Sequence, residues 1–149
     1  KDGMKIGYAR SVWAMISLNT RKPADLLALH GGSIVDYVCD EPCPIEKPSR
    51  IKVTSTEPAS SLNAKYSDID INGHVNSIRY IEHILDLFPI ELYKESRIRR
   101  FEMAYVAESY YGDELTFYKD YVGNGTYDIE VRKNGGEAVC RSKVIFVEK

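Results

Sequence analysis

The sequence has few cysteines, no long apolar run and little net charge, and each shortage narrows the range of functions. Three cysteines in 149 residues do not make a disulfide framework and suit a reducing compartment, so we expect a cytoplasmic protein. No apolar run approaches the roughly 20 residues of a membrane helix, and we expect no membrane partner. A formal net charge of −2 gives no support for a nucleic-acid partner.

Motifs for cofactor, metal and serine chemistry are also lacking. The sequence contains no glycine-rich phosphate loop and no G-x-S-x-G elbow, which disfavours cofactor-dependent enzymes and serine hydrolases. Cys39 and Cys43 lie near His30, but a zinc site needs four ligands and this segment offers no second Cys or His pair. We therefore expect no cofactor and no metal.

Composition divides the chain into three parts. Residues 4–19 contain many β-formers and alternate apolar side chains, which predicts a long strand. Residues 23–48 contain short helical turns, a glycine pair and several prolines, which is typical of a linker. Residues 49–149 are long enough for one domain. "ARSVWAMI" near the start resembles "CRSKVIFV" near the end; this is either the chance likeness of two strands or a sign that the first strand closes an earlier copy of the same domain.

The third part combines one predicted helix with strands. The helix lies between His74 and Pro89, where apolar residues recur every three or four positions. Strands are predicted at 50–56, in the segment leading into Tyr66, and at 100–109, 114–122, 126–133 and 137–148. One helix of about four turns cannot form a core alone, so its apolar stripe must pack on an antiparallel sheet. The prediction is an α+β domain of the hot-dog type, a sheet wrapped around one central helix.

Polar side chains crowd the start of this helix, in "YSDIDINGHVN". Asn72 could act as the helix cap by itself, which leaves Asp70 and His74 unexplained. Gly73 supplies backbone freedom for a tight turn. His74 could orient a water molecule and Asp70 could activate it. A lone Asp or His is more often structural, but the whole cluster at a helix start indicates a catalytic site.

These residues resemble a known enzyme family. "SDIDINGHVNSIRYIEHILDLFP" resembles the catalytic segment of the acyl-acyl carrier protein thioesterases of plants and bacteria, and "ARSVWAMISLNTRKPADL" resembles the strand that closes their first hot-dog domain. The resemblance implies two tandem hot-dog domains. Residues 1–22 would be the closing strand of the first, residues 23–48 the linker, and residues 49–149 the complete second domain. A broader match to hot-dog thioesterases of coenzyme A covers only "YSDIDINGHVN".

The resemblance also implies a set of catalytic residues. Its motif places them at Asp70, Asn72 and His74, and the stretch "FEMAYVAESYYGDEL" resembles the family's Y-x-x-E-C segment, which adds Glu108. The plant members usually have cysteine after this glutamate, whereas this chain has Ser109, so we prefer an activated water as nucleophile. Asp70 and Glu108 both remain candidates for the general base.

The implied function is hydrolysis of acyl-acyl carrier protein thioesters, which releases free fatty acids. The alternatives are a hot-dog acyl-coenzyme A thioesterase and a non-catalytic acyl-binding domain, although the latter does not need the polar cluster. The implied partner is an acidic acyl carrier protein, with a homodimer as one option for the assembly. The basic stretch "KESRIRR", with Lys94, Arg97, Arg99 and Arg100, is either a docking patch for that partner or a solvated loop.

Overall fold

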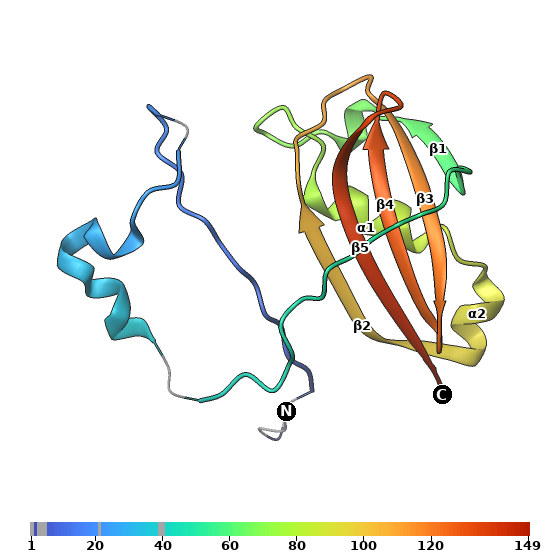
Figure 1. Ribbon diagram of the computed structural model, residues 1–149, viewed down its shortest axis with the longest axis horizontal. Helices are drawn as coiled ribbons and strands as arrows, with labels where there is room; N and C mark the ends of the chain where they lie inside the picture. The colour runs from blue at the N-terminus through green and yellow to red at the C-terminus, as the bar shows by residue number, and fades with distance from the viewer. Residues whose placement is uncertain (1, 3–5, 21, 39–40) are drawn as a thin grey trace. The chain divides into compact units, whose positions relative to one another are not determined.

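The computed structural model describes residues 2, 6–20, 22–38 and 41–149, so Cys39 and the first residues of the predicted strand at 4–19 lie outside the described residues. The chain forms two compact units, Lys1–Pro48 and Ser49–Lys149, which we call the first and second unit (Figure 1). Within the described ranges, no helix has both the length and the apolar character needed to cross a bilayer.

The described part of the first unit does not form the strand predicted at residues 4–19. Residues 6–15 pair with no strand of the described chain, and the one bridge nearby joins Ile16 to Pro23. Backbone groups of a strand need a neighbouring strand as partner, and without one the side chains of Val12 and Trp13 stay exposed. That residues 1–22 close a preceding domain stays a prediction. In the predicted linker, η1 (Leu26–Tyr37) consists of two short 3-10 pieces separated by a kink at residues 29–32.

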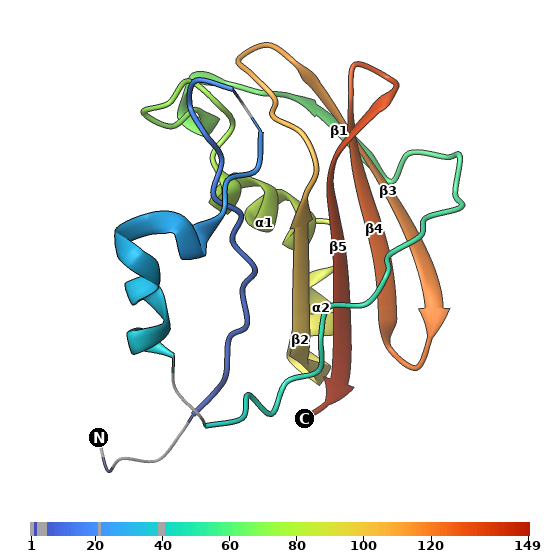
Figure 2. The same cartoon turned by 60° about the vertical axis from the view of Figure 1, so that its left-hand side comes forward.

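The second unit is a five-stranded antiparallel sheet with strand order β1-β3-β4-β5-β2 (Figures 1 and 2). The predictions for the last three strands are confirmed to within one residue, because tight glycine turns separate them. The strands are β1 Ser60–Asn63, β2 Ser96–Tyr105, β3 Glu114–Gly123, β4 Thr126–Lys133 and β5 Glu137–Glu148. β2 begins and ends four residues earlier than predicted.

The strand predicted at residues 50–56 is wrong. This segment crosses the outer face of the sheet, the face opposite the central helix, instead of joining an edge (Figure 1). Amides of the segment and of the residue before it bond to acidic side chains of that face: Ser49 N donates to Glu102 Oε2 at 2.9 Å, and Thr54 N donates to Asp120 Oδ2 at 2.6 Å. With these donors engaged, the segment adds no rung to the sheet, and the first edge strand is β1.

The central helix, α1, spans Ser77–Leu85 and packs on the inner face of the sheet. It begins three residues later than predicted because Val75 is still extended, paired with Ile69. Asn76 caps it by accepting from Ile78 N at 2.9 Å, so the prediction of Asn72 as the cap is wrong. The core combines Tyr80 and Ile84 of α1 with sheet residues that include Phe117, Ile129, Val131, Val144 and Phe146. The α+β hot-dog prediction is confirmed.

A second, short helix follows α1 and was not predicted. α2 spans Ile90–Glu95, directly after Pro89. It divides the basic stretch of the sequence, because Lys94 ends α2 whereas Arg97, Arg99 and Arg100 belong to β2. The stretch is therefore not a loop.

Candidate functional site

A tight turn between Ile69 and Val75 carries three of the predicted site residues. The two ends pair as a bridge, Asp70 N donates to His74 O at 2.9 Å, and Gly73 N donates to Asp70 O at 3.0 Å. Gly73 has φ +82°, in the left-handed region that glycine adopts without strain. The turn therefore projects His74 from a fixed backbone immediately before α1.

The Asp70 carboxylate helps to hold this turn. Its Oδ1 accepts from Asn72 N at 2.8 Å and from His74 N at 3.4 Å. Such side-chain to backbone bonds are typical of aspartate in turns. Asp70 thus contacts the backbone of His74, and one of its oxygens is already engaged by amides.

The connection from β2 to β3 forms the other wall of the site. β2 ends at Tyr105, where Val106 N and Ala107 N both donate to Val139 O, at 2.8 and 3.3 Å, so Glu108 lies in a loop and not on the predicted strand. Further along, Val75 N donates to Ser109 O at 2.8 Å. This single bond joins the turn to the loop and sets Glu108 beside His74.

The side chains of His74 and Glu108, two of the predicted site residues, meet. His74 Nε2 lies 3.5 Å from Glu108 Oε2, and the two side chains are 31% and 49% exposed, so a substrate can reach both. Tyr110 OH donates to the same Oε2 at 3.1 Å, and its ring meets the His74 ring edge-on at 5.2 Å. Lys133 Nζ donates to the Glu108 carbonyl at 2.7 Å. The Glu108 carboxylate and the His74 imidazole thus lie side by side where solvent can reach both.

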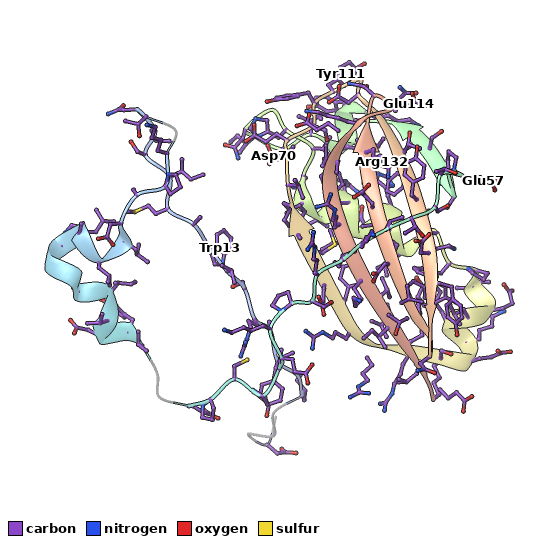
Figure 3. The ribbon with its side chains drawn as sticks, in the orientation of Figure 1. Trp13, Glu57, Asp70, Tyr111, Glu114 and Arg132 are labelled. Carbon is purple, nitrogen blue, oxygen red and sulfur yellow. The ribbon has the colours of Figure 1, made fainter. Side chains whose placement is uncertain are left out.

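Asn72 lies apart from this pair. It is exposed, and its side-chain amide makes no hydrogen bond with any residue that the structure describes. The structure therefore brings His74 and Glu108 together, links Asp70 to the backbone of His74 and leaves Asn72 in solvent. Asp70 and Tyr111 lie toward the same end of the second unit, where β3 begins at Glu114 (Figure 3).

A buried pair of hydroxyls, Tyr80 and Ser109, supports the site from inside. Tyr80 of α1 and Ser109 of the loop hydrogen-bond to each other, and both residues are almost completely buried, with 3% and 1% exposed. Burial raises the pKa of the Tyr80 hydroxyl, and the bond to Ser109 offsets part of that effect. The side chain of Ser109 is directed into the core, away from the accessible His74 and Glu108.

Asp68, also part of the polar cluster in the sequence, is buried and structural. Its Oδ2 accepts from Lys65 N at 2.7 Å, and its carbonyl accepts from Asn76 N at 2.7 Å. His83 Nε2 of α1 lies 3.6 Å from Asp68 Oδ1. Asp68 therefore fixes the residue that caps α1. The sequence showed that Asp68 belongs to the polar cluster, but it did not show that Asp68 holds the capping residue of α1.

Comparisons with known proteins place these residues in a family. The sequence model of the acyl-ACP thioesterase C-terminal domain, where ACP is acyl carrier protein, matches residues 51–148. The palmitoyl-acyl carrier protein thioesterase of Arabidopsis thaliana is 28% identical over 112 residues, covering 71% of this chain and 27% of the relative. The dodecanoyl-[acyl-carrier-protein] hydrolase of Cinnamomum camphora is 26% identical over 113 residues, covering 72% and 30%.

Solved structures give the same result. The crystal structure of an acyl-ACP thioesterase from Bacteroides thetaiotaomicron is 78% identical with a TM-score of 0.91, and the match covers 98% of this chain and 58% of that one. A 12:0-ACP thioesterase from Umbellularia californica, 17% identical, shares the fold with a TM-score of 0.73 over 90% of this chain and 53% of its own. This chain thus spans under a third of these two curated relatives and little more than half of either structure. The chain belongs to the acyl-ACP thioesterase family, and residues 51–148 are its C-terminal domain.

Proposed function

We propose that this protein hydrolyses the thioester between a fatty acyl chain and acyl carrier protein and releases the free fatty acid. Membership of the family supports the substrate class. The observation that carries the proposal is the accessible pair of His74 and Glu108, 3.5 Å apart on two loops that one backbone bond holds together. A domain that merely binds acyl chains has no need for such a pair.

In this mechanism Glu108 is the general base. It takes a proton from a water molecule whose oxygen attacks the thioester carbonyl carbon, with His74 orienting that water. The C–O bond forms and the carbonyl oxygen becomes an oxyanion, and Asn72, which lies apart from the pair, is assigned no part in this step. The intermediate then collapses, the C–S bond breaks, and the proton held by Glu108 passes to the departing thiolate. Glu108 is preferred to Asp70 because Asp70 Oδ1 already accepts from backbone amides.

A serine nucleophile does not fit the geometry. Ser109 is 1% exposed, and its hydroxyl bonds to the phenol of Tyr80. A serine needs an adjacent base to attack a carbonyl, and within the described part of the chain the Ser109 hydroxyl makes no hydrogen bond to His74 or Glu108. Attack by water therefore remains the better mechanism for this site.

The proposed docking surface for the acidic carrier protein is smaller than the basic stretch of the sequence. Arg97 and Arg99 are exposed on β2, whereas Arg100 is half-buried with its Nε 2.5 Å from Glu102 Oε1. β2 leads from these two arginines to the loop that carries Glu108. We assign the attraction for the carrier protein to Arg97 and Arg99. The cytoplasmic location and the homodimer stay predictions.

The test compares Glu108→Gln and His74→Ala with the unmodified protein, using acyl-ACP and acyl-coenzyme A substrates in parallel. Loss of general acid–base catalysis should lower kcat about 10²–10⁴-fold. Folding should survive, because Glu108 is half-exposed and His74, 31% exposed, lies outside the hydrophobic core. Glu114→Gln is the matched control, since Glu114 is an exposed glutamate at the same end of the unit (Figure 3). Near-normal turnover by Glu108→Gln would remove the proposed base, and hydrolysis of the coenzyme A thioester alone would favour the alternative substrate.

A further inference from the structure

Tyr110 contacts both members of the proposed catalytic pair at once. Its hydroxyl donates to Glu108 Oε2 at 3.1 Å, and its ring lies edge-on to the His74 ring, with centroids 5.2 Å apart and planes at 80°. The same carboxylate oxygen of Glu108 faces His74 Nε2. One tyrosine therefore limits where the carboxylate points and how the imidazole is turned.

The backbone of Tyr110 is held firmly enough to serve that purpose. Tyr110 N donates to Asp113 Oδ2 at 2.9 Å, and Asp113 N donates back to Tyr110 O at 3.1 Å. Asn134, in the turn after β4, donates from Nδ2 to Asp113 Oδ1 at 2.9 Å. The bond from Asn134, followed by the bond from Tyr110 N, lowers the pKa of Asp113, so this anchor stays ionised at neutral pH.

Lys133 restrains the backbone of Glu108 but does not hold its side chain. Lys133 Nζ donates to the Glu108 carbonyl at 2.7 Å, lies 3.1 Å from Glu137 Oε2 and sits 5.9 Å from the centre of the Tyr110 ring. A glutamate that is half-exposed loses little by changing rotamer. Without a donor at Oε2, the Glu108 carboxylate would spend much of its time turned away from His74.

We propose that Tyr110 is a positioning residue for the hydrolysis, holding the Glu108 carboxylate beside His74 through its hydroxyl. This inference rests on the proposed function, in which Glu108 is the base. The hydroxyl acts on Glu108 and need not touch the substrate. Its loss should therefore lower the rate of the chemical step and leave substrate binding nearly unchanged.

The first experiment is Tyr110→Phe, which removes the hydroxyl and keeps the ring edge against His74. A hydrogen bond to an ionised carboxylate at a half-exposed site corresponds to about a tenfold change, so kcat should fall about tenfold with KM within about twofold. Tyr111→Phe is the matched control, because it removes one hydroxyl from the next residue, which is 71% exposed, and it should keep full activity. A wild-type kcat for Tyr110→Phe would overturn the inference.

The second experiment separates positioning from a purely structural role. In a Glu108→Ala background, adding Tyr110→Phe should lower kcat no further, because the hydroxyl has lost the group through which it acts. A further tenfold loss in that background would overturn the inference. The proposed function fails separately, if Glu108→Ala alone retains normal turnover. The inference fails by itself if Glu108→Ala is inactive while Tyr110→Phe is fully active.

Discussion

Replacing Ser109 with alanine separates stability from catalysis at this site. The Ser109 and Tyr80 hydroxyls bond to each other in a region where both residues are at most 3% exposed. Alanine at position 109 leaves the Tyr80 hydroxyl buried without this partner, which costs about 1–3 kcal/mol of unfolding free energy. Tyr80→Phe strands the Ser109 hydroxyl and should cost a similar amount. Replacing both removes both polar groups, so the double variant should lose less than the sum of the two.

Urea unfolding of the four proteins in this cycle gives the coupling free energy between the two hydroxyls. We expect a coupling of about 1 kcal/mol or more, as for a shared buried hydrogen bond. The kcat of Ser109→Ala, measured well below its unfolding midpoint, should remain within a few-fold of the unmodified protein. Water, and not the serine, is the proposed nucleophile, so the catalytic machinery is intact.

Two results would refute this reasoning. Strictly additive losses of stability would show that the hydroxyls do not share a bond that matters in solution. A loss of kcat as large as that of Glu108→Gln, together with an acyl group trapped on Ser109 and detected by mass spectrometry, would make the serine the nucleophile. The first result would contradict the proposed energetic role of the Tyr80–Ser109 hydrogen bond. The second would contradict attack by water.

Two further perturbations test other parts of the second unit. Charge reversal at Arg97 and Arg99 should slow association with acyl carrier protein and flatten its dependence on salt, measured as kcat/KM across ionic strengths; unchanged kinetics would make this basic patch a solvated surface. Gly125→Ala should destabilise by about 3 kcal/mol or more in urea unfolding, because Gly125 has φ +67° and a Cβ there would overlap the carbonyl oxygen of Phe146. Gly135→Ala, with φ +77° but open space around its Cβ, should cost only about 1–2 kcal/mol, and equal losses for the two would contradict the overlap.

The parts of the fold that the sequence predicted well are those with local signals. Asn124–Gly125, the two-residue loop between β3 and β4, has positive φ at both residues, as such hairpin turns require. Asn134 and Gly135, in the three-residue loop between β4 and β5, also have positive φ. The strands beside these turns were placed to within one residue. The segment at residues 50–56 has the composition of a strand, yet its amides at Thr54 and Ser55 bond to Asp120, and the amide of Ser49 just before it bonds to Glu102 of β2. Such partners are distant in sequence, and no local pattern reveals them.

For the site, too, the sequence predicted what local signals determine and missed what depends on distant residues. The tight turn with Gly73, and the presence of Asp70 and His74 on it, follow from nearby residues. The position of Glu108 beside His74 depends on the bond from Val75 N to the carbonyl of Ser109, the residue after Glu108. Val75 and Ser109 are more than 30 positions apart in the sequence. The contribution of Tyr110 depends on the same meeting of two loops, so spacing along the chain could not show it.

The segment that crosses the outer face has a consequence for where this domain starts. Regular secondary structure in the second unit begins at Ser60, but Asp120 accepts hydrogen bonds from Thr54 N, Thr54 Oγ1 and Ser55 N. These bonds, the one from Thr54 N foremost, lower the pKa of Asp120, so the stabilisation they give is present at neutral pH and is lost as the pH falls through that lowered value. A polypeptide cut just before β1 would keep every strand and helix of the unit and still lose this stabilisation. Acid would remove the same stabilisation from the uncut chain by protonating Asp120. Low pH should therefore detach from the sheet the same stretch of polypeptide that the truncation deletes.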